Sequence, residues 1–174
     1  YVRRAASVCM DDAEARRELL AVLTENARQE TADVAIQLGL SEERAATLVE
    51  ALKTEGVLRG YQAVVDWGQA DVQHVTAELE LNVELDRETT YEDVARRVVK
   101  FSEVESLRLV SGDFDFAATV TGESMNDVSH FVAERIATIP EVTQTVTHFV
   151  METYKDRGVE FESREDDDRL SVSP

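Results

Sequence analysis

Two carboxylates separated by one residue, Asp113 and Asp115, are the pair whose type and spacing could do chemistry in this chain. Residues two apart on an extended turn can approach one ligand together, so such a pair can bind a cation or share acid-base work. Gly112 precedes them, and glycine favours a turn at this point. Paired carboxylates are also common as solvated turn residues, above all in an acidic chain, and we therefore expect no catalysis here.

The other residues that could bind metal or act as nucleophiles give weaker signals. His74, His130 and His148 lack the close spacing of metal ligands, so packing or surface roles are favoured over a metal site. The single cysteine, Cys9, can form no intramolecular disulfide and no cysteine zinc cluster. No phosphate-cradling glycine loop and no nucleophile elbow occurs. We expect no metal, no cofactor and no enzymatic activity.

A second group of side chains has the types that contact nucleic acid: cations for phosphates and a hydroxyl for a base edge. They lie within or just before residues 30–67, which fit two short helices joined by a turn. We expect them to contact DNA from the start and end of the second helix and from the segments that flank the helix pair. For each one, a solvated surface side chain is the alternative. The residues are Arg28, Arg44, Thr47, Lys53 and Arg59.

The helix pair is predicted from apolar spacing and from helix-end signals. Thr31 is an N-cap candidate, and Gly39 can take the left-handed conformation that ends a helix. Ser41 can accept the free amides of a second helix, which has one apolar face. After Gly56 the residues up to Trp67 are rich in β-formers, which predicts a two-stranded β-wing. A winged helix-turn-helix is the architecture of a DNA-reading head, and a structural helical hairpin is the alternative.

The rest of the chain has the pattern of a second, mixed domain. Its strands are predicted from alternation of apolar and polar residues, and its helices from capping signatures. The resulting order, βαββαβ, is that of the ferredoxin-like sandwich, an α+β fold. The expected strands are 74–85, 104–111, 114–121 and 142–154, and the capping signatures are 90–93 and 124–127.

A winged helix-turn-helix joined to a βαββαβ domain resembles the Lrp/AsnC family, the feast/famine transcription regulators of bacteria and archaea. The resemblance covers most of the chain. EGVLRGYQAVVD at 55–66 resembles the family's wing, and VSGDFDF at 110–116 resembles its glycine-acid-aromatic-aspartate turn. It implies that the second domain is of the RAM (regulation of amino-acid metabolism) type, which dimerises, assembles further and binds effectors, commonly amino acids, between protomers. It also implies that Gly112, Asp113 and Asp115 line the effector pocket.

The charge balance points to a salty environment. The net charge is -18, from 36 Asp and Glu against 18 Lys and Arg, and only three of these cations are lysines. Acid-rich, lysine-poor chains are expected where salt screens self-repulsion, so a halophile's protein, of haloarchaeal type, is favoured over an ordinary acidic one. No stretch reaches transmembrane length, and residues 1–10 do not fit a secretory signal. We therefore expect a cytoplasmic protein that does not contact the membrane.

The same acidity bears on DNA binding. Residues 41–55 carry four glutamates against Arg44 and Lys53, which departs from the usual basic recognition helix. Residues 1–60 are nearly neutral, however, with eight Lys or Arg and eleven Asp or Glu, whereas residues 61–174 hold ten and twenty-five. In molar salt the counterion-release contribution weakens, which leaves base contacts and DNA shape to supply specificity. A weakly charged DNA-reading head is then tolerable.

The sequence predicts a transcription regulator of three segments. Residues 1–67 form the winged helix-turn-helix DNA-binding domain, 68–158 the effector-binding and oligomerisation domain, and 159–174 an acidic C-terminal tail that is solvated or lies across a partner subunit. The regulator is expected to bind double-stranded DNA as a homodimer or higher homo-oligomer and to respond to a small effector, such as an amino acid. The alternative is a metabolite-sensing oligomeric module whose helical head contacts protein rather than DNA. A small enzyme that uses Asp113 and Asp115 is the third and weakest interpretation.

Overall fold

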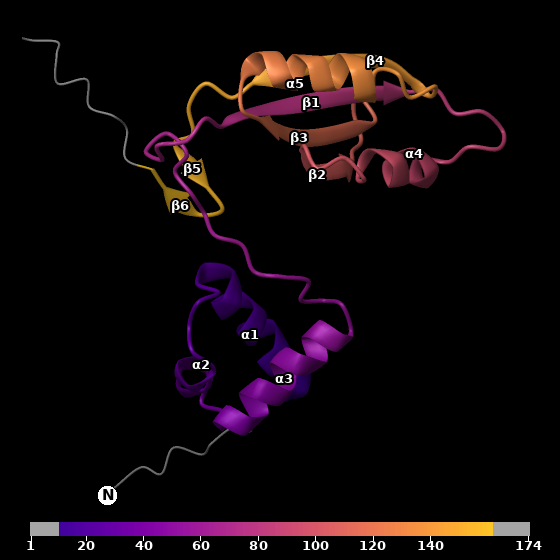
Figure 1. The fold of residues 1–174 in the computed structure, drawn as a ribbon. Helices are drawn as coiled ribbons and strands as arrows, with labels where there is room; N and C mark the ends of the chain where they lie inside the picture. The colour runs from indigo at the N-terminus through magenta and orange to yellow at the C-terminus, as the bar shows by residue number, and fades with distance from the viewer. Residues whose placement is uncertain (1–10, 162–174) are drawn as a thin grey trace, which may run out of the picture. The chain divides into compact units, whose positions relative to one another are not determined.

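The computed structural model describes residues 11–161, and the chain divides into two compact units, Tyr1–Val64 and Val65–Pro174. The first unit is helical, and the second is an antiparallel sheet with helices packed on it (Figure 1). This confirms the predicted α+β class. Cys9 and the part of the predicted tail at 162–174 lie outside the described residues.

The described part of the first unit, residues 11–64, contains three helices, of which α1 lies outside the elements predicted from the sequence. Its signals are nevertheless local. The side chain of Asp11 accepts a hydrogen bond from the backbone amide of Glu14 at 2.8 Å, which caps the helix start. Ala15 and Leu19, four residues apart, are both fully buried and form its apolar stripe. The helices are α1 (Asp12–Glu25), α2 (Thr31–Leu38) and α3 (Glu42–Thr54).

The predicted turn between α2 and α3 is confirmed. Gly39 ends α2 in the left-handed conformation, with φ 66° and ψ 28°. The Ser41 hydroxyl accepts the backbone amide of Arg44 at 3.2 Å and so caps α3. The start of α2 differs by one residue from the prediction, because Thr31 is already helical and the extended Glu30 occupies the cap position. The two helices therefore meet at a tight, well-defined turn.

The β-wing predicted after Gly56 is absent from the described residues. Residues 57–66 form no paired strand, although many of them are β-formers. Val57 is 52% exposed and Tyr61 49% exposed, so their apolar surfaces cover little of the helical unit. A two-stranded hairpin is marginal in water unless it packs on another element, and β-propensity alone does not hold one together.

The second unit has the predicted βαββαβ order, with sheet order β2-β3-β1-β4 and antiparallel neighbours throughout. Both capping signatures are present. Thr90 and Asp93 form a reciprocal capping box, and Ser124 accepts the Asp127 amide. The elements are β1 (Val75–Val83), α4 (Tyr91–Val98), β2 (Val104–Leu109), β3 (Phe116–Gly122), α5 (Met125–Phe131) with a π-helical continuation (Val132–Ile136), and β4 (Val142–Phe149).

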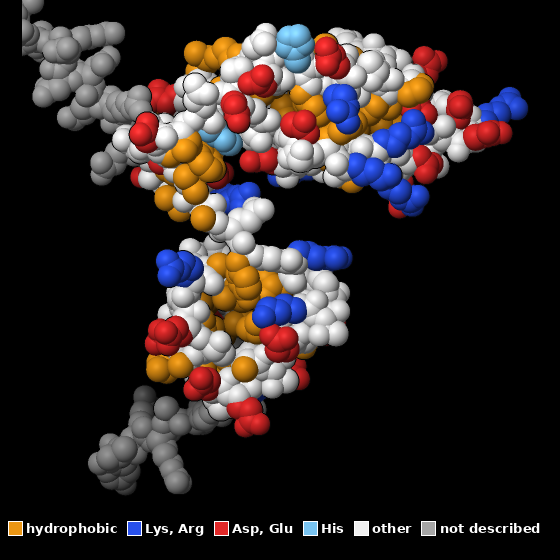
Figure 2. All heavy atoms as spheres, in the orientation of Figure 1, with side chains coloured by type: hydrophobic (Ala, Val, Ile, Leu, Met, Phe, Trp, Pro, Cys, Tyr) orange, Lys and Arg blue, Asp and Glu red, His pale blue; other side chains and the backbone are white. Residues whose placement is uncertain are grey.

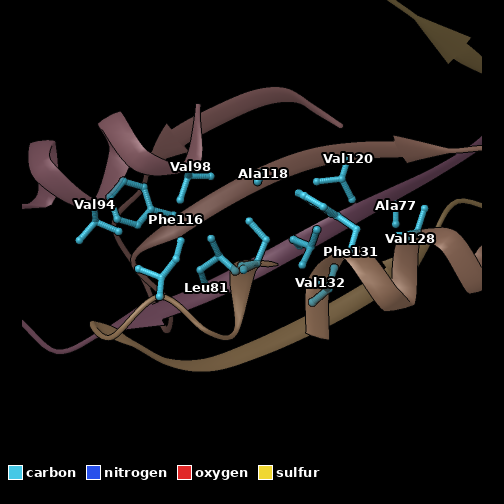
Figure 3. Packing of buried hydrophobic residues seen from close by; sticks show 13 residues of the cluster. Ala77, Leu81, Val94, Val98, Phe116, Ala118, Val120, Val128, Phe131 and Val132 are labelled. Atoms are coloured by element: carbon cyan, nitrogen blue, oxygen red, sulfur yellow. The ribbon is translucent and has the colours of Figure 1, made fainter. Parts of the chain in front are cut away.

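The core of this unit lies between the sheet and its two helices (Figure 3). Alternate residues of β1 and β3 point into it, and register pairs such as Leu79 with Ala118 place them side by side. Val94 and Val98, which lie one helical turn apart on α4, pack against these strand residues, and so does Val128 from α5. The apolar residues that alternate along the strands and those that recur every turn of the helices therefore pack into one cluster.

The last strand is shorter than predicted. β4 ends at Phe149 instead of continuing to residue 154, because its partner β1 begins at Val75 and the final bond runs from the Val150 amide to the Thr76 carbonyl. The chain then forms a small hairpin of β5 (Lys155–Asp156) and β6 (Val159–Glu160). Positive φ at Arg157 (45°) and Gly158 (87°) suits such a two-residue turn.

Candidate functional site

The predicted effector residues lie on the turn at 110–115, between β2 and β3. The Val110 amide donates to the Asp115 carbonyl at 2.9 Å and closes the turn. Gly112 has φ +148°, a conformation that side-chain-bearing residues rarely adopt, and a Cβ built there would meet no atom within 4 Å. The glycine is therefore required by the backbone, and the space above it is open. Asp113 beside it is exposed.

The structure separates the two carboxylates that the sequence places together. Both oxygens of Asp115 are held by the protein: Oδ2 accepts the Val83 amide at 2.9 Å, and Oδ1 accepts the Tyr91 hydroxyl at 3.1 Å. Asp113, by contrast, is exposed at the apex of the turn. They do not form an acid-base pair: Asp113 is exposed, whereas Asp115 is half-buried and hydrogen-bonded within the protein.

Tyr91 and Val83 are site residues that the sequence gives no direct means to find. Tyr91 is the first residue of α4, and Val83 ends β1, so neither is near Asp115 in the chain. The hydrogen bond to Asp115, followed by the charge of that carboxylate and by burial, raises the pKa of Tyr91 above its ordinary value. The phenol therefore stays protonated at neutral pH and acts as a donor.

In the helical unit, the side of α3 that faces solvent carries two of the predicted DNA contacts, Thr47 and Lys53. The Thr47 hydroxyl donates to the Glu43 carbonyl at 2.8 Å, one turn back in the same helix. Lys53 Nζ lies 2.8 Å from Glu50 Oε1, and this hydrogen bond raises the pKa of Lys53. The lysine charge is thus partly balanced on the same side of the helix.

The third predicted contact on α3, Arg44, lies on the flank that meets α1. Its guanidinium is 2.8 Å from Asp12. At the other end of α3, Arg16 of α1 binds Glu55 through both terminal guanidinium nitrogens, with Nη1 3.0 Å from Oε1. This bond lowers the pKa of Glu55. Arg16 and Glu55 are 39 residues apart, so no local pattern reveals the pair.

The remaining two predicted contacts flank the helix pair. Arg28 is exposed in the turn before α2, where its amide donates to the Asn26 side chain at 3.0 Å. Arg59 is exposed beyond α3, and its guanidinium lies over Gly56, 3.1 Å from where a Cβ would be. In Figure 2 the basic side chains on the drawn face of this unit lie in its upper part and the acidic ones below them, and the basic side chains do not form a continuous area.

A hollow in the second unit was not predicted. It has a volume of about 500 Å³ and is lined by the segment before β1, by Thr76 near the start of β1, and by residues that follow β4. The rings of Trp67 and His74 stack there with centroids 4.2 Å apart and an interplanar angle of 19°. Asp66 and Glu152 also line it, and no Lys or Arg does.

The other histidines lie beside single carboxylates: His130 Nδ1 is 3.6 Å from Glu134, and His148 Nε2 is 3.3 Å from Glu80. Within residues 11–161, no group of three potential metal ligands comes together. Among the helices in this range, none has the length and apolar composition needed to cross a membrane.

Comparisons with known proteins agree on one family. A family model for the Lrp/AsnC ligand binding domain matches residues 76–160. The chain is 36% identical over 162 residues to the uncharacterized HTH-type transcriptional regulator YugG of Bacillus subtilis (strain 168), covering 92% of this chain and 98% of the relative. It is 26% identical over 139 residues to the leucine-responsive regulatory protein of Escherichia coli (strain K12), covering 80% and 84%. The crystal structure of the Neisseria meningitidis transcriptional regulator NMB0573 in complex with L-Met has a similar fold, with a TM-score of 0.66 and 24% identity over 82% of this chain and 92% of that one.

Proposed function

Because the chain belongs to the Lrp/AsnC family of helix-turn-helix transcription regulators, we propose that it binds specific DNA sites as a homo-oligomer and that a small amino-acid effector changes this binding. The observation that carries the DNA-binding part is the helix pair. Gly39 closes α2, Ser41 caps α3, and the solvent-facing side of α3 carries Thr47. Such a helix can lie in the major groove with its side chains on base edges.

The exposure and contacts of the predicted DNA-binding residues support a different role for each. Thr47, on the exposed side of α3, is the candidate for a base edge, while Lys53, Arg28 and Arg59 are candidates for phosphates. Arg44 must leave Asp12 before it can reach DNA, so we assign it first to holding α3. In a two-fold dimer, two copies of α3 would meet half-sites about one helical turn apart.

The effector is assigned to the turn at 110–115. An amino acid presents an ammonium group, which suits the exposed carboxylate of Asp113, and a carboxylate, which suits backbone amides near the exposed Gly112. The names of two relatives support this class of ligand: one is leucine-responsive and the other was crystallised with L-Met. Binding between protomers would let the effector change the assembly and hence the spacing of the two heads.

We further propose that the protein works in the cytoplasm of a salt-rich cell. The support is compositional: 36 acidic residues against 18 basic ones, with three lysines in the whole chain. The helical unit supports it independently, because the solvent-facing side of α3 carries Glu43 and Glu50 beside Lys53. DNA binding by such a surface relies less on neutralising phosphates, which is the contribution to affinity that high salt removes.

The test is selection of bound sequences from a random double-stranded DNA pool by the full chain, at salt from roughly 0.1 M to above 1 M. An inverted-repeat motif is expected. Thr47→Ala should then relax preference at one base position by about 1–3 kcal/mol, and Lys53→Ala should weaken all sites and reduce the salt slope by about one. Thr138→Ala is the matched control, because its hydroxyl also bonds a carbonyl one turn back. Selection without any enriched motif would refute sequence-specific DNA binding.

The glutamates at 43 and 50 favour one other function, a metabolite-sensing oligomer whose helical head contacts a protein. Replacement of Lys53 and Arg59, the proposed phosphate contacts, by alanine separates the two functions. A DNA reader loses specific DNA binding, whereas a protein-contacting head keeps a partner that binds in the absence of DNA.

A further inference from the structure

The contacts of Asp115 point to a role other than ligand binding. We propose that Asp115 is a positioning residue that uses the Val83 amide and the Tyr91 hydroxyl to hold the turn at 110–115 in the shape that an effector requires. This deepens the effector site proposed above and rests on it for the class of ligand. The position of the turn itself does not depend on that assignment.

The backbone amide, the carbonyl and both carboxylate oxygens of Asp115 each make a hydrogen bond within the protein. Its amide donates to the Leu81 carbonyl at 3.0 Å, and its carbonyl accepts the Val110 amide at 2.9 Å. Its two carboxylate oxygens accept from Val83 and Tyr91. These two bonds occupy about half of the acceptor positions of the carboxylate and fix its direction, whereas the carboxylate of Asp113 is exposed.

The bond to Val83 replaces a missing strand contact. The β1-β3 ladder ends at the pair Leu81 and Phe116, and the β1-β4 register shifts between Asn82 and Val83. The Val83 amide therefore lies beyond the last β1-β3 pair, where no β3 carbonyl is available. The Asp115 carboxylate takes that place and fixes the base of the turn to the end of β1.

The bond to Tyr91 connects the same point to a helix. Tyr91 begins α4, and its ring packs edge-on against Phe116 with centroids 5.9 Å apart at 69°. Phe116 follows Asp115 directly and is 2% exposed, so ring and hydroxyl of Tyr91 hold adjacent residues. A change in the turn is thereby transmitted to the start of α4.

The apex of the turn is open to solvent, whereas its base is fixed by the hydrogen bonds of Asp115. Asp113 is exposed, and the space around Gly112 is open. We therefore assign ligand contact to Asp113 and the backbone near Gly112, and positioning to Asp115.

The first experiment is hydrogen exchange of the ligand-free full chain with two variants. Tyr91→Phe keeps the ring but removes the hydroxyl, and Asp115→Asn removes the charge. Both should raise exchange of the amides of Val83 and residues 110–116, by about tenfold in Asp115→Asn. Asp113→Asn, the matched control two residues away, should leave it at the wild-type rate. Wild-type exchange in both Tyr91→Phe and Asp115→Asn would overturn the proposal.

A second readout reports the bond itself. The titration of Tyr91 is obtained as the difference in tyrosinate absorbance between the wild type and Tyr91→Phe. Because Asp115 raises the pKa of Tyr91, Asp115→Asn measured against the Asp115→Asn, Tyr91→Phe double variant should show a lower pKa, while Asp113→Asn should not change it. An unchanged pKa in Asp115→Asn would contradict the bond.

Calorimetric titration with each of the twenty amino acids completes the test. The amino acid that binds the wild type should bind Tyr91→Phe several-fold more weakly, although this hydroxyl does not touch the ligand, and Asp113→Asn about tenfold more weakly. Wild-type affinity in Tyr91→Phe would overturn the positioning role. Failure of all twenty to bind the wild type would refute the effector part of the proposed function, while hydrogen exchange would still decide the role of Asp115.

Discussion

Each of the two units of this protein is stabilised internally in a different way. The helical unit has a small buried cluster, and the sheet unit has a cluster of thirteen buried residues between its sheet and helices. The helical unit also ties α3 to α1 at both ends through ion pairs, Asp12 with Arg44 and Arg16 with Glu55, and the larger sheet unit has a bidentate pair of Arg97 with Glu141. The five buried residues of its cluster are Ala15, Leu19, Val34, Leu48 and Leu52.

This difference divides the work between the units. Apolar burial is insensitive to pH and is strengthened rather than weakened by many salts, so the sheet unit is suited to be a stable platform for the effector turn. Exposed ion pairs are weak individually and are screened by salt. The ion pairs at the two ends of α3, the helix proposed to read DNA, therefore respond to pH and salt, whereas the packing of its buried Leu48 and Leu52 does not.

The largest expected effect comes from matched leucine truncations in the two cores. Leu19, fully buried in the helical unit, and Leu79, 2% exposed in the sheet unit, should each cost about 2–5 kcal/mol when replaced by alanine. Since the helical unit has the smaller core, Leu19→Ala should abolish exchange protection in α1–α3 while the sheet stays protected. Leu79→Ala should weaken the sheet without unfolding it. Segment-resolved hydrogen exchange measures both, and joint loss of protection in both units would show that they unfold as one.

The next largest effect on stability is expected from replacing one glycine in each unit. Neither Gly39 nor Gly112 has an atom within 4 Å of a built Cβ, so alanine tests the backbone alone. At Gly39, with φ 66°, alanine should cost about 1–2 kcal/mol, and asparagine, which visits this region, should cost less. At Gly112, with φ 148°, alanine and asparagine should both cost on the order of 1–3 kcal/mol. Denaturant unfolding of the four variants is the measurement, and relief by asparagine at Gly112 would contradict the comparison.

The same contrast explains what the sequence could predict. Gly39 and Ser41 reveal the α2-α3 turn because capping is local, and the sheet unit follows from alternation that one buried face requires. The ion pair of Arg16 with Glu55 spans 39 residues and leaves no local pattern.

Two further differences come from tertiary contacts. Spacing suggested that Asp113 and Asp115 act together, but the positions of Val83 and Tyr91, set by the fold, engage only Asp115. The β-wing was predicted from propensity, which does not supply the packing partner that a hairpin needs.

A smaller effect is expected from the pair of Arg16 with Glu55. The bond from Arg16 holds the pKa of Glu55 below its ordinary value of 4.5. A depressed pKa in the folded state stabilises the fold above the unfolded pKa, and this contribution is lost as the pH falls through the folded pKa. Glu55→Gln should therefore lower the stability of the helical unit near neutral pH, and the difference from wild type should close below about pH 4.

The measurement is thermal unfolding of α1–α3, monitored by segment-resolved hydrogen exchange. It is made at several pH values between acid and neutral, at low and at molar salt. Because the pair is exposed, the deficit of Glu55→Gln should be small and should shrink in molar salt. Glu18→Gln removes an exposed charge from α1 and serves as the control. An equal pH dependence of stability in the two variants would mean that Arg16 does not hold Glu55 in solution.

The smallest effect concerns DNA affinity and tests whether the exposed side of α3 faces the phosphates. Glu50 pairs with Lys53 at 2.8 Å on this side, so Glu50→Gln removes a repelling charge and frees the lysine. Affinity for a selected DNA site should rise a few-fold at low salt, and the gain should vanish toward molar salt, where counterion release contributes little. Glu18→Gln changes the net charge equally but lies on α1, so any general charge effect appears in both variants. A gain confined to Glu50→Gln places α3 against DNA, whereas equal gains would mean that only the overall charge of the head matters and that another surface reads the site.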